Sequence, residues 1–240
     1  MKKFIALLFF AAALASPSFA QPGKNYEDLL KLFVDDKFEK CLYKAEGYTL
    51  DEKTKKDPLP YLYVSRCYFE MSKRDEFREK YPNSFKDAMK YLSKYGSKDK
   101  EKQFAAEFED FFAAIRMAAM AEAETMMETN KATKAKQLYD NLLDLDPNDA
   151  GAQLALGLAF QSLKSKKESE DAFKKAKAIL AEKKAGTTKE QLILLKDALT
   201  RHATALAGTS KESAKEWLEL GMEYFPDDKE YKLTYDTIVG

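Results

Sequence analysis

Apolar residues recur every three to four positions along most of this chain, which is the spacing of one face of an α-helix. Residues 142–163 show it clearly, because one apolar run stops at Asp146-Pro147-Asn148-Asp149 and another begins at once. Pro147 cannot continue the preceding helix and moves Asp146 away from helical backbone angles. The pattern predicts two helices joined at a sharp corner.

The same spacing predicts helices along the rest of the chain. They cover residues 25–34, 36–48, 59–71, 84–95, 99–129, 132–145, 149–163, 166–183, 188–207, 210–224 and 227–238. Thr188 and Gln191 have the separation of a capping box, Ser210 suits an N-cap, and Asn130 suits a left-handed turn. Gly157 inside a helix costs about 1 kcal/mol relative to alanine, so it predicts a second helix packed closely against it.

A period of 34 residues relates two parts of the chain. Six positions correspond to six others one period earlier, and five of these pairs match small with small and large apolar with large. The later set is Leu156, Gly157, Phe160, Ser169, Phe173 and Ala176, and the earlier set is Glu122, Ala123, Met126, Ala135, Tyr139 and Leu142. Glu122 is the exception. Weaker echoes of these intervals run from about residue 26 to the end, which indicates an array of two-helix units.

The sequences LGLAF at 156–160, AFKKA at 172–176 and LDLDPND at 143–149 resemble the tetratricopeptide repeat, a helix-turn-helix unit. The chain departs from that pattern at Gln153, Ser169 and Ala181, where the family shows tryptophan, alanine and proline. The resemblance implies an all-α solenoid of about 11 helices in four to five units, one domain over residues 21–240. Its clear repeats are 116–149 and 150–183, its degenerate units are 26–115 and 184–228, and residues 227–239 form a closing helix.

The resemblance also implies that the first helix of each unit lines a concave groove for a protein or peptide partner. The expected groove positions are Leu62, Arg66, Phe69, Met120, Glu124, Met127, Leu154, Leu158 and Gln161. Methionine side chains adapt to imperfect partners. The alternative is that many of these residues only pack against neighbouring units. Some proteins of this family bind the C-terminal carboxylate of a partner with inward-facing lysine and asparagine. Leu154 and Leu158 occupy such positions here, so that activity is disfavoured.

The first twenty residues, MKKFIALLFFAAALASPSFA, have the form of a secretory signal peptide. Two lysines precede a short apolar stretch, and Ser18 and Ala20 flank Phe19 in a small-x-small cleavage pattern. The apolar stretch is too short for a spanning helix, which needs about 20 residues. We expect cleavage after Ala20 and a periplasmic or secreted protein. No cysteine lies near this position, so a lipoprotein anchor is not expected.

Charge and composition narrow the class of partner. Without Lys2 and Lys3, 38 of the 40 basic residues remain against 40 acidic residues, a formal charge of −2. A near-neutral chain gives no signal for nucleic acid or an anionic membrane, and no later stretch predicts membrane insertion. The expected partner is another polypeptide of the cell envelope, an expectation that comes from the resemblance.

The two cysteines, Cys41 and Cys67, form an even count in a protein expected to leave the cytoplasm. One disulfide is therefore permitted, since these residues fall in helices expected to pack together. The alternative is a pair of small buried thiols. Neither belongs to a C-x-x-C pair, so no cysteine-based metal site or redox motif is expected.

Residues for catalysis are sparse. His202 is the only histidine and lies in a helix, where packing or exposure explains it. The acidic runs at 107–110 and 168–171 fit solvated helix faces. No nucleophile elbow, phosphate loop or metal motif occurs, so neither cofactor nor metal is expected. The sequence favours a non-catalytic protein-binding adaptor, and the alternative is a helical enzyme or binding protein that acts on cell-wall glycan.

Overall fold

The computed structural model describes residues 26–240, and the predicted signal peptide lies outside these residues. They form eleven α-helices and one short 3-10 helix. The helices are α1 (Glu27–Val34), α2 (Phe38–Leu50), α3 (Pro58–Ser72), η1 (Asp75–Phe77), α4 (Ser84–Lys98), α5 (Glu109–Glu128), α6 (Ala132–Leu145), α7 (Ala150–Ser162), α8 (Lys166–Ala181), α9 (Lys189–Ala207), α10 (Lys211–Met222) and α11 (Lys229–Val239). The all-α prediction is confirmed.

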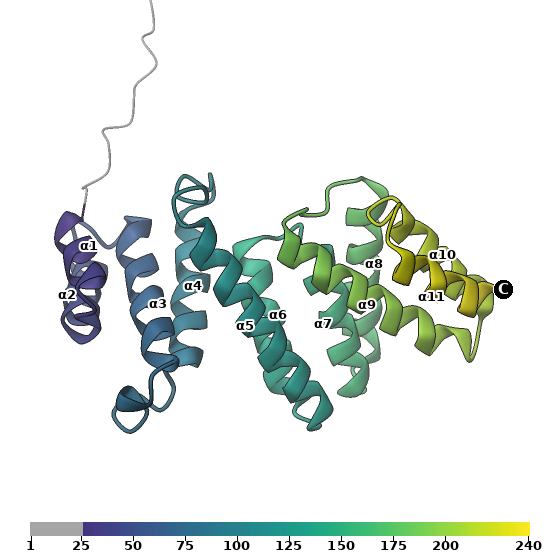
Figure 1. The fold of residues 1–240 in the computed structure, drawn as a ribbon, viewed down its shortest axis with the longest axis horizontal. Coiled ribbons are helices and arrows are strands. Elements are labelled where there is room, and N and C mark those ends of the chain that lie inside the picture. The colour runs from purple at the N-terminus through teal and green to yellow at the C-terminus, as the bar shows by residue number, and fades with distance from the viewer. Residues whose placement is uncertain (1–25) are drawn as a thin grey trace, which may run out of the picture.

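Consecutive helices pack in pairs, α1 with α2, α3 with α4, α5 with α6, α7 with α8 and α9 with α10, while α11 packs on α10 and α9. Neighbouring pairs join through α2 and α3, α4 and α6, α6 and α7, and α7 and α9. The result is an elongated row with α1 and α2 at one end and α10 and α11 at the other (Figure 1). Each pair buries its apolar face against the next, as expected of stacked two-helix units.

Two apolar clusters hold the row together. A smaller one joins α1, α2 and α3 around residues such as Leu29, Cys41 and Val64. A larger one runs from α3 to α11 and includes Leu92 and Tyr231. In the described part of the chain, no helix has the length and apolar character needed to cross a membrane.

The corner predicted at Pro147 is present. Asp146, which ends α6, has an extended backbone with φ −143° and ψ 99°. Asp149 then caps α7, because its Oδ1 accepts the backbone N–H of Ala152 at 2.9 Å. The other predicted punctuation is also confirmed: Thr188 and Gln191 form a capping box, Ser210 caps α10, and Asn130 has a positive φ of 56°.

The single long helix predicted over residues 99–129 is wrong at its start, since α5 begins at Glu109. The buried Asp99 side chain accepts the backbone N–H groups of Gln103 and Phe104 at 2.9 and 3.3 Å. Aspartate competes for backbone groups in this way and favours turns over helix. Lys102 follows with a positive φ of 53°, which turns the chain before α5.

Candidate functional site

The predicted groove positions divide into buried and accessible residues. Leu62 and Leu154 are fully buried and Phe69 is 4% exposed, so these three pack in the core, and their assignment to an open groove is corrected. The accessible ones remain a prediction: Arg66, Met120, Met127 and Leu158 are partly exposed, and Glu124 and Gln161 are exposed.

The cause of this burial is the packing around α7. Nine of its 13 residues are buried, so α7 has almost no free face. Two flanking helices, α5 and α9, also contact each other, and Glu124 of α5 accepts a hydrogen bond from the Arg201 guanidinium of α9. In Figure 1, α9 crosses in front of α7, and α5 lies in front of α6. The expected concave surface at Leu154 is therefore filled by the chain itself.

The Arg66 guanidinium packs against aromatic rings of the same chain. Its guanidinium carbon lies 3.9 Å from the ring centre of Phe33, 4.8 Å from that of Phe108 and 5.1 Å from that of Tyr63. Burial lowers the pKa of this guanidinium. Such ring contacts stabilise a cation that has left water. They tie α1 and the segment before α5 to α3, so the structure gives Arg66 a packing role.

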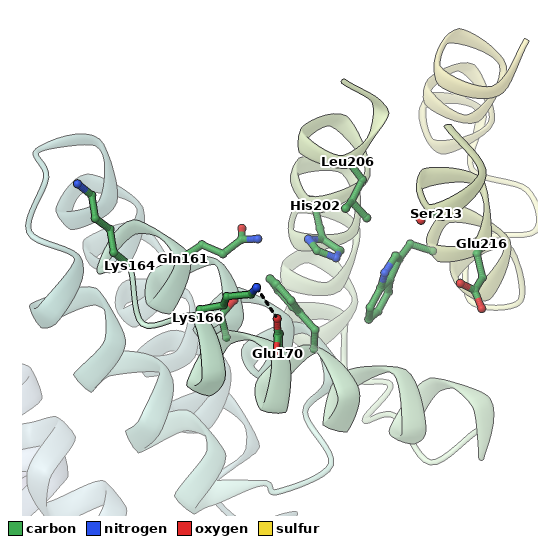
Figure 2. A pocket seen from close by; sticks show the side chains of 11 residues that line it. Gln161, Lys164, Lys166, Glu170, His202, Leu206, Ser213 and Glu216 are labelled. Atoms are coloured by element: carbon green, nitrogen blue, oxygen red, sulfur yellow. Dashed lines mark ion pairs between the residues drawn. The ribbon is translucent and has the colours of Figure 1, made fainter. Parts of the chain in front are cut away.

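An open cavity of about 510 Å³ lies near the C-terminal end of the row, and we call it the C-terminal pocket. It is formed by the end of α7, by α8, and by α9 and α10 (Figure 2). Its lining residues are Gln161, Lys164, Lys166, Ser169, Glu170, Phe173, His202, Leu206, Ser213, Glu216 and Trp217. Among the groove residues predicted from the sequence, only Gln161 belongs to it.

Three rings line this pocket. The His202 imidazole lies 4.1 Å from the ring centre of Phe173 and 4.9 Å from that of Trp217, in a T-shaped arrangement with the latter. His202 is 3% exposed and its Nδ1 has no hydrogen-bond partner. Burial lowers the pKa of His202 to about 4, because desolvation disfavours the imidazolium. The ring is therefore neutral at pH 7, and of the two roles considered for His202, packing and exposure, its burial shows packing.

Gly157 places Phe173 in this trio. A Cβ added at Gly157 would overlap the Phe173 ring, so only glycine lets the ring lie against α7. The Ser169 hydroxyl fixes the same contact by donating to the Gly157 carbonyl at 3.0 Å. The close approach predicted at Gly157 is thus present. Its relation to Trp217 was not visible in the sequence.

The residues of the pocket suit the binding of a ligand better than catalysis. The Ser169 hydroxyl is engaged with Gly157, and the Ser213 hydroxyl lies 2.9 Å from that of Ser210. Its charged groups oppose each other, as in the 3.8 Å ion pair between Lys166 and Glu170 (Figure 2). These residues form an aromatic recess with a charged rim, which suits an apolar side chain.

Of the carboxylates in the two acidic runs noted in the sequence, only Glu170 lines this pocket, where it pairs with Lys166. Those of the run 107–110 are exposed, as are those of 168–171, which fits solvated helix faces. Asp149 is fully buried and pairs with the buried guanidinium of Arg116 while it caps α7. Burial raises the pKa of Asp149, although Arg116 opposes that effect. Within residues 26–240, no three metal-ligating side chains are gathered.

The two cysteines lie together between α2 and α3. Both are buried free thiols in the smaller apolar cluster, and the Cys41 thiol donates to the Leu29 carbonyl at 3.5 Å. The expected packing of their two helices is confirmed. Formation of the disulfide stays a prediction, which intact-mass measurement before and after reduction would test.

No protein-family model matches this sequence, and no curated protein matches it significantly. Among solved structures, the chain is similar to the TPR2AB-domain:pHSP90-complex of yeast Sti1, with 13% sequence identity and a TM-score of 0.32 over 88% of this chain and 83% of that chain. A likeness at this level carries no functional argument. The fold assignment rests on the helix order and packing described above.

Proposed function

We propose that this protein is a non-catalytic adaptor of the bacterial cell envelope that binds a partner polypeptide. One observation carries the proposal, namely the C-terminal pocket, where Phe173, His202 and Trp217 line an open recess. Apolar recesses with a few polar groups at the rim are the usual form of a binding pocket. Aromatic anchors also dominate the energetics of protein interfaces.

The neutral imidazole keeps the recess apolar at neutral pH. A large apolar side chain of the partner would contact the rings and Leu206, which is partly exposed at the pocket. At the rim, Lys166 and Glu216 would contact the partner's polar groups. Because both signs of charge are present, we expect the anchor side chain, rather than net charge, to select the ligand.

Display of random peptides on phage would test this pocket. Leu206→Lys places a charge in the recess, whereas Ile193→Lys changes an exposed residue of the same helix, outside the pocket. We expect peptides with a large apolar residue to be selected, and to bind the Leu206→Lys variant at least tenfold more weakly. Equal binding to all three proteins would remove the pocket from the proposal.

The cellular location is a separate part of the proposal and rests on the sequence of residues 1–20. Export would remove these residues and leave a chain that begins at Gln21. Intact-mass measurement of the protein from the periplasmic and external fractions tests this directly. A mass that retains residues 1–20 would contradict export by cleavage after Ala20.

A further inference from the structure

A second cavity, of about 580 Å³, lies between α4, α5 and α6, and we call it the lysine groove. Its floor is apolar, and its rim carries lysines and amides. The floor residues are Phe85, Met89, Met126 and Leu138, the lysines are Lys86, Lys90, Lys94 and Lys134, and the amides are Asn83, Gln137 and Asn141. Among residues 26–240, Glu122 is the one carboxylate that lines the groove.

The three lysines of α4 share one face of their helix. Lys86, Lys90 and Lys94 are spaced four residues apart, so neighbouring Cβ atoms are about 6 Å apart. All three are exposed. Lys134 of α6 adds a fourth cation to the lining. The groove thus presents a row of positive charge about 12 Å long beside apolar side chains.

These four lysines form no ion pair within residues 26–240, and the one cation–π contact among them is that of Lys94, whose ammonium lies 4.5 Å from the Tyr91 ring centre. Lys136, on the same helix as Lys134, does form an ion pair, with Asp140 at 2.6 Å. Like charges at a four-residue spacing weaken a helix by a few tenths of a kcal/mol. In a chain with 40 basic and 40 acidic residues, this local excess of unpaired cations points to an external anionic partner.

The packing of α4 on α6 explains why the groove exists. The two helices meet closely at Gly96, where an added Cβ would lie 2.7 Å from the Asp144 carbonyl oxygen. The Ser93 hydroxyl also donates to the Asp144 carboxylate there. The groove residues of α4 lie N-terminal to Gly96, where the helix has no second glycine. In that part Met89 is fully buried and Phe85 is partly buried.

We propose that the lysine groove binds an acidic amphipathic segment of a partner polypeptide. Apolar side chains of the segment would pack on the partly buried Phe85 and Met126, and its carboxylates would pair with Lys86, Lys90 and Lys94. Asn141 and its amide neighbours would hydrogen-bond the segment's backbone. The proposal rests on the proposed function, since it requires a chain that binds polypeptides, and it adds a second surface distinct from the C-terminal pocket.

The shape of the site favours a peptide over other anions. A concave groove with an apolar floor cannot lie flush against a flat bilayer. A single-stranded nucleic acid needs exposed rings for its bases, whereas Phe85, partly buried, is the only aromatic residue that lines the groove. The bound segment does not need to be the C-terminal end of the partner, because the lysines form a row and are not gathered around one terminal carboxylate.

The test is phage display with random peptides fused to the coat protein through their C-terminal ends, so that no free terminal carboxylate is offered. The baits are the wild-type protein and the triple variant Lys86→Gln/Lys90→Gln/Lys94→Gln. The matched control is Lys174→Gln/Lys175→Gln/Lys211→Gln, three exposed lysines outside the groove. Circular dichroism verifies that each variant folds. Selected peptides, vesicles with one-third phosphatidylglycerol and an oligothymidine strand are then measured for binding.

We expect the wild-type protein to select peptides that combine several Asp or Glu residues with apolar ones. Their Kd should rise at least tenfold in the groove variant, stay within twofold in the control, and rise with salt. Three results would overturn the inference: selected peptides without an acidic excess, equal binding to the groove variant, or groove-dependent binding of only vesicles or oligothymidine. If peptide binding is weakened by Leu206→Lys and not by the groove variant, the inference fails while the proposed function stands. If no peptide binds the wild-type protein, both fail.

Discussion

The surroundings of α7 and α4 differ in how closely the neighbouring helices approach. α7 contains two glycines at which a neighbouring helix packs closely, Gly151 in its first turn and Gly157 in its middle. A Cβ at Gly151 would lie 2.6 Å from the Leu195 backbone nitrogen, and one at Gly157 would overlap Phe173. α4 has only Gly96, at its C-terminal end, beside the Asp144 carbonyl. α7 is sealed on nearly all sides, while α4 keeps an open groove beside it.

The difference shows that small residues decide where an array closes and where it stays accessible. A position without a side chain lets two backbones touch, which excludes water and removes any binding surface. Where larger residues stand at such positions the backbones stay further apart, and beside α4 a cavity remains. Four predictions test this contrast, from the largest expected effect to the smallest.

The largest effect is expected at the start of α7. Asp149→Ala leaves the buried Arg116 guanidinium without its partner and removes the N-cap of α7. Breaking such a pair destabilises a protein by about 3–5 kcal/mol. The control is Asp144→Ala at the end of α6 beside α4, an exposed carboxylate, with an expected loss below about 1 kcal/mol. Urea unfolding measures both, and similar losses would contradict the contrast.

Alanine at two glycines should change stability in opposite directions. Gly151→Ala forces a methyl group against the Leu195 backbone and should cost about 1–3 kcal/mol. Gly47→Ala in α2 meets no atom within 4 Å and should stabilise by about 0.5–1 kcal/mol, since glycine weakens a helix interior. Thermal unfolding followed by circular dichroism would detect both. A stabilised Gly151→Ala variant would show that α7 is not tightly sealed.

His202 should make stability depend on pH. Its folded pKa of about 4 lies below the unfolded value of about 6.5, so the unfolded chain binds the proton more readily as pH falls. The stability is complete above pH 6.5, and about 2 kcal/mol is lost between pH 7 and pH 5. His202→Phe keeps a ring in the pocket and should lack this component. If the difference between the two proteins is constant from pH 7 to pH 5, His202 is not desolvated as described.

The smallest effect on stability is expected at the lysine groove. The triple variant Lys86→Gln/Lys90→Gln/Lys94→Gln breaks no ion pair and relieves repulsion between like charges, so unfolding should become harder by a few tenths of a kcal/mol. Residues kept at a stability cost are expected where binding needs them. A loss above about 1 kcal/mol would mean that the lysines support the fold, and that the groove is no more open than the surroundings of α7.

Much of the fold could be predicted because its signals are local. The corner at Pro147, the cap at Thr188 and the close approach at Gly157 each depend on the properties of one or two residues. Helix positions followed from apolar spacing, and the pairing of helices followed from the 34-residue period. The turn of residues 99–104 was missed because Asp99 has to be buried beside Tyr95 before its carboxylate organises that turn.

The candidate sites could not be predicted in the same way, because residue spacing does not show which side chains of a helix face are buried and which stay exposed. The sequence by itself determined a helical array, most of its helix boundaries and the close approach at Gly157, since these follow from covalent geometry and from periodic burial of apolar side chains. Only the tertiary structure decided that Leu154 is covered while Lys90 is free, and that His202 lies between Phe173 and Trp217. The physical reason is that exposure depends on which distant helices meet: α9 packs along α7 and also contacts α5, whereas α4, α5 and α6 leave a cavity between them.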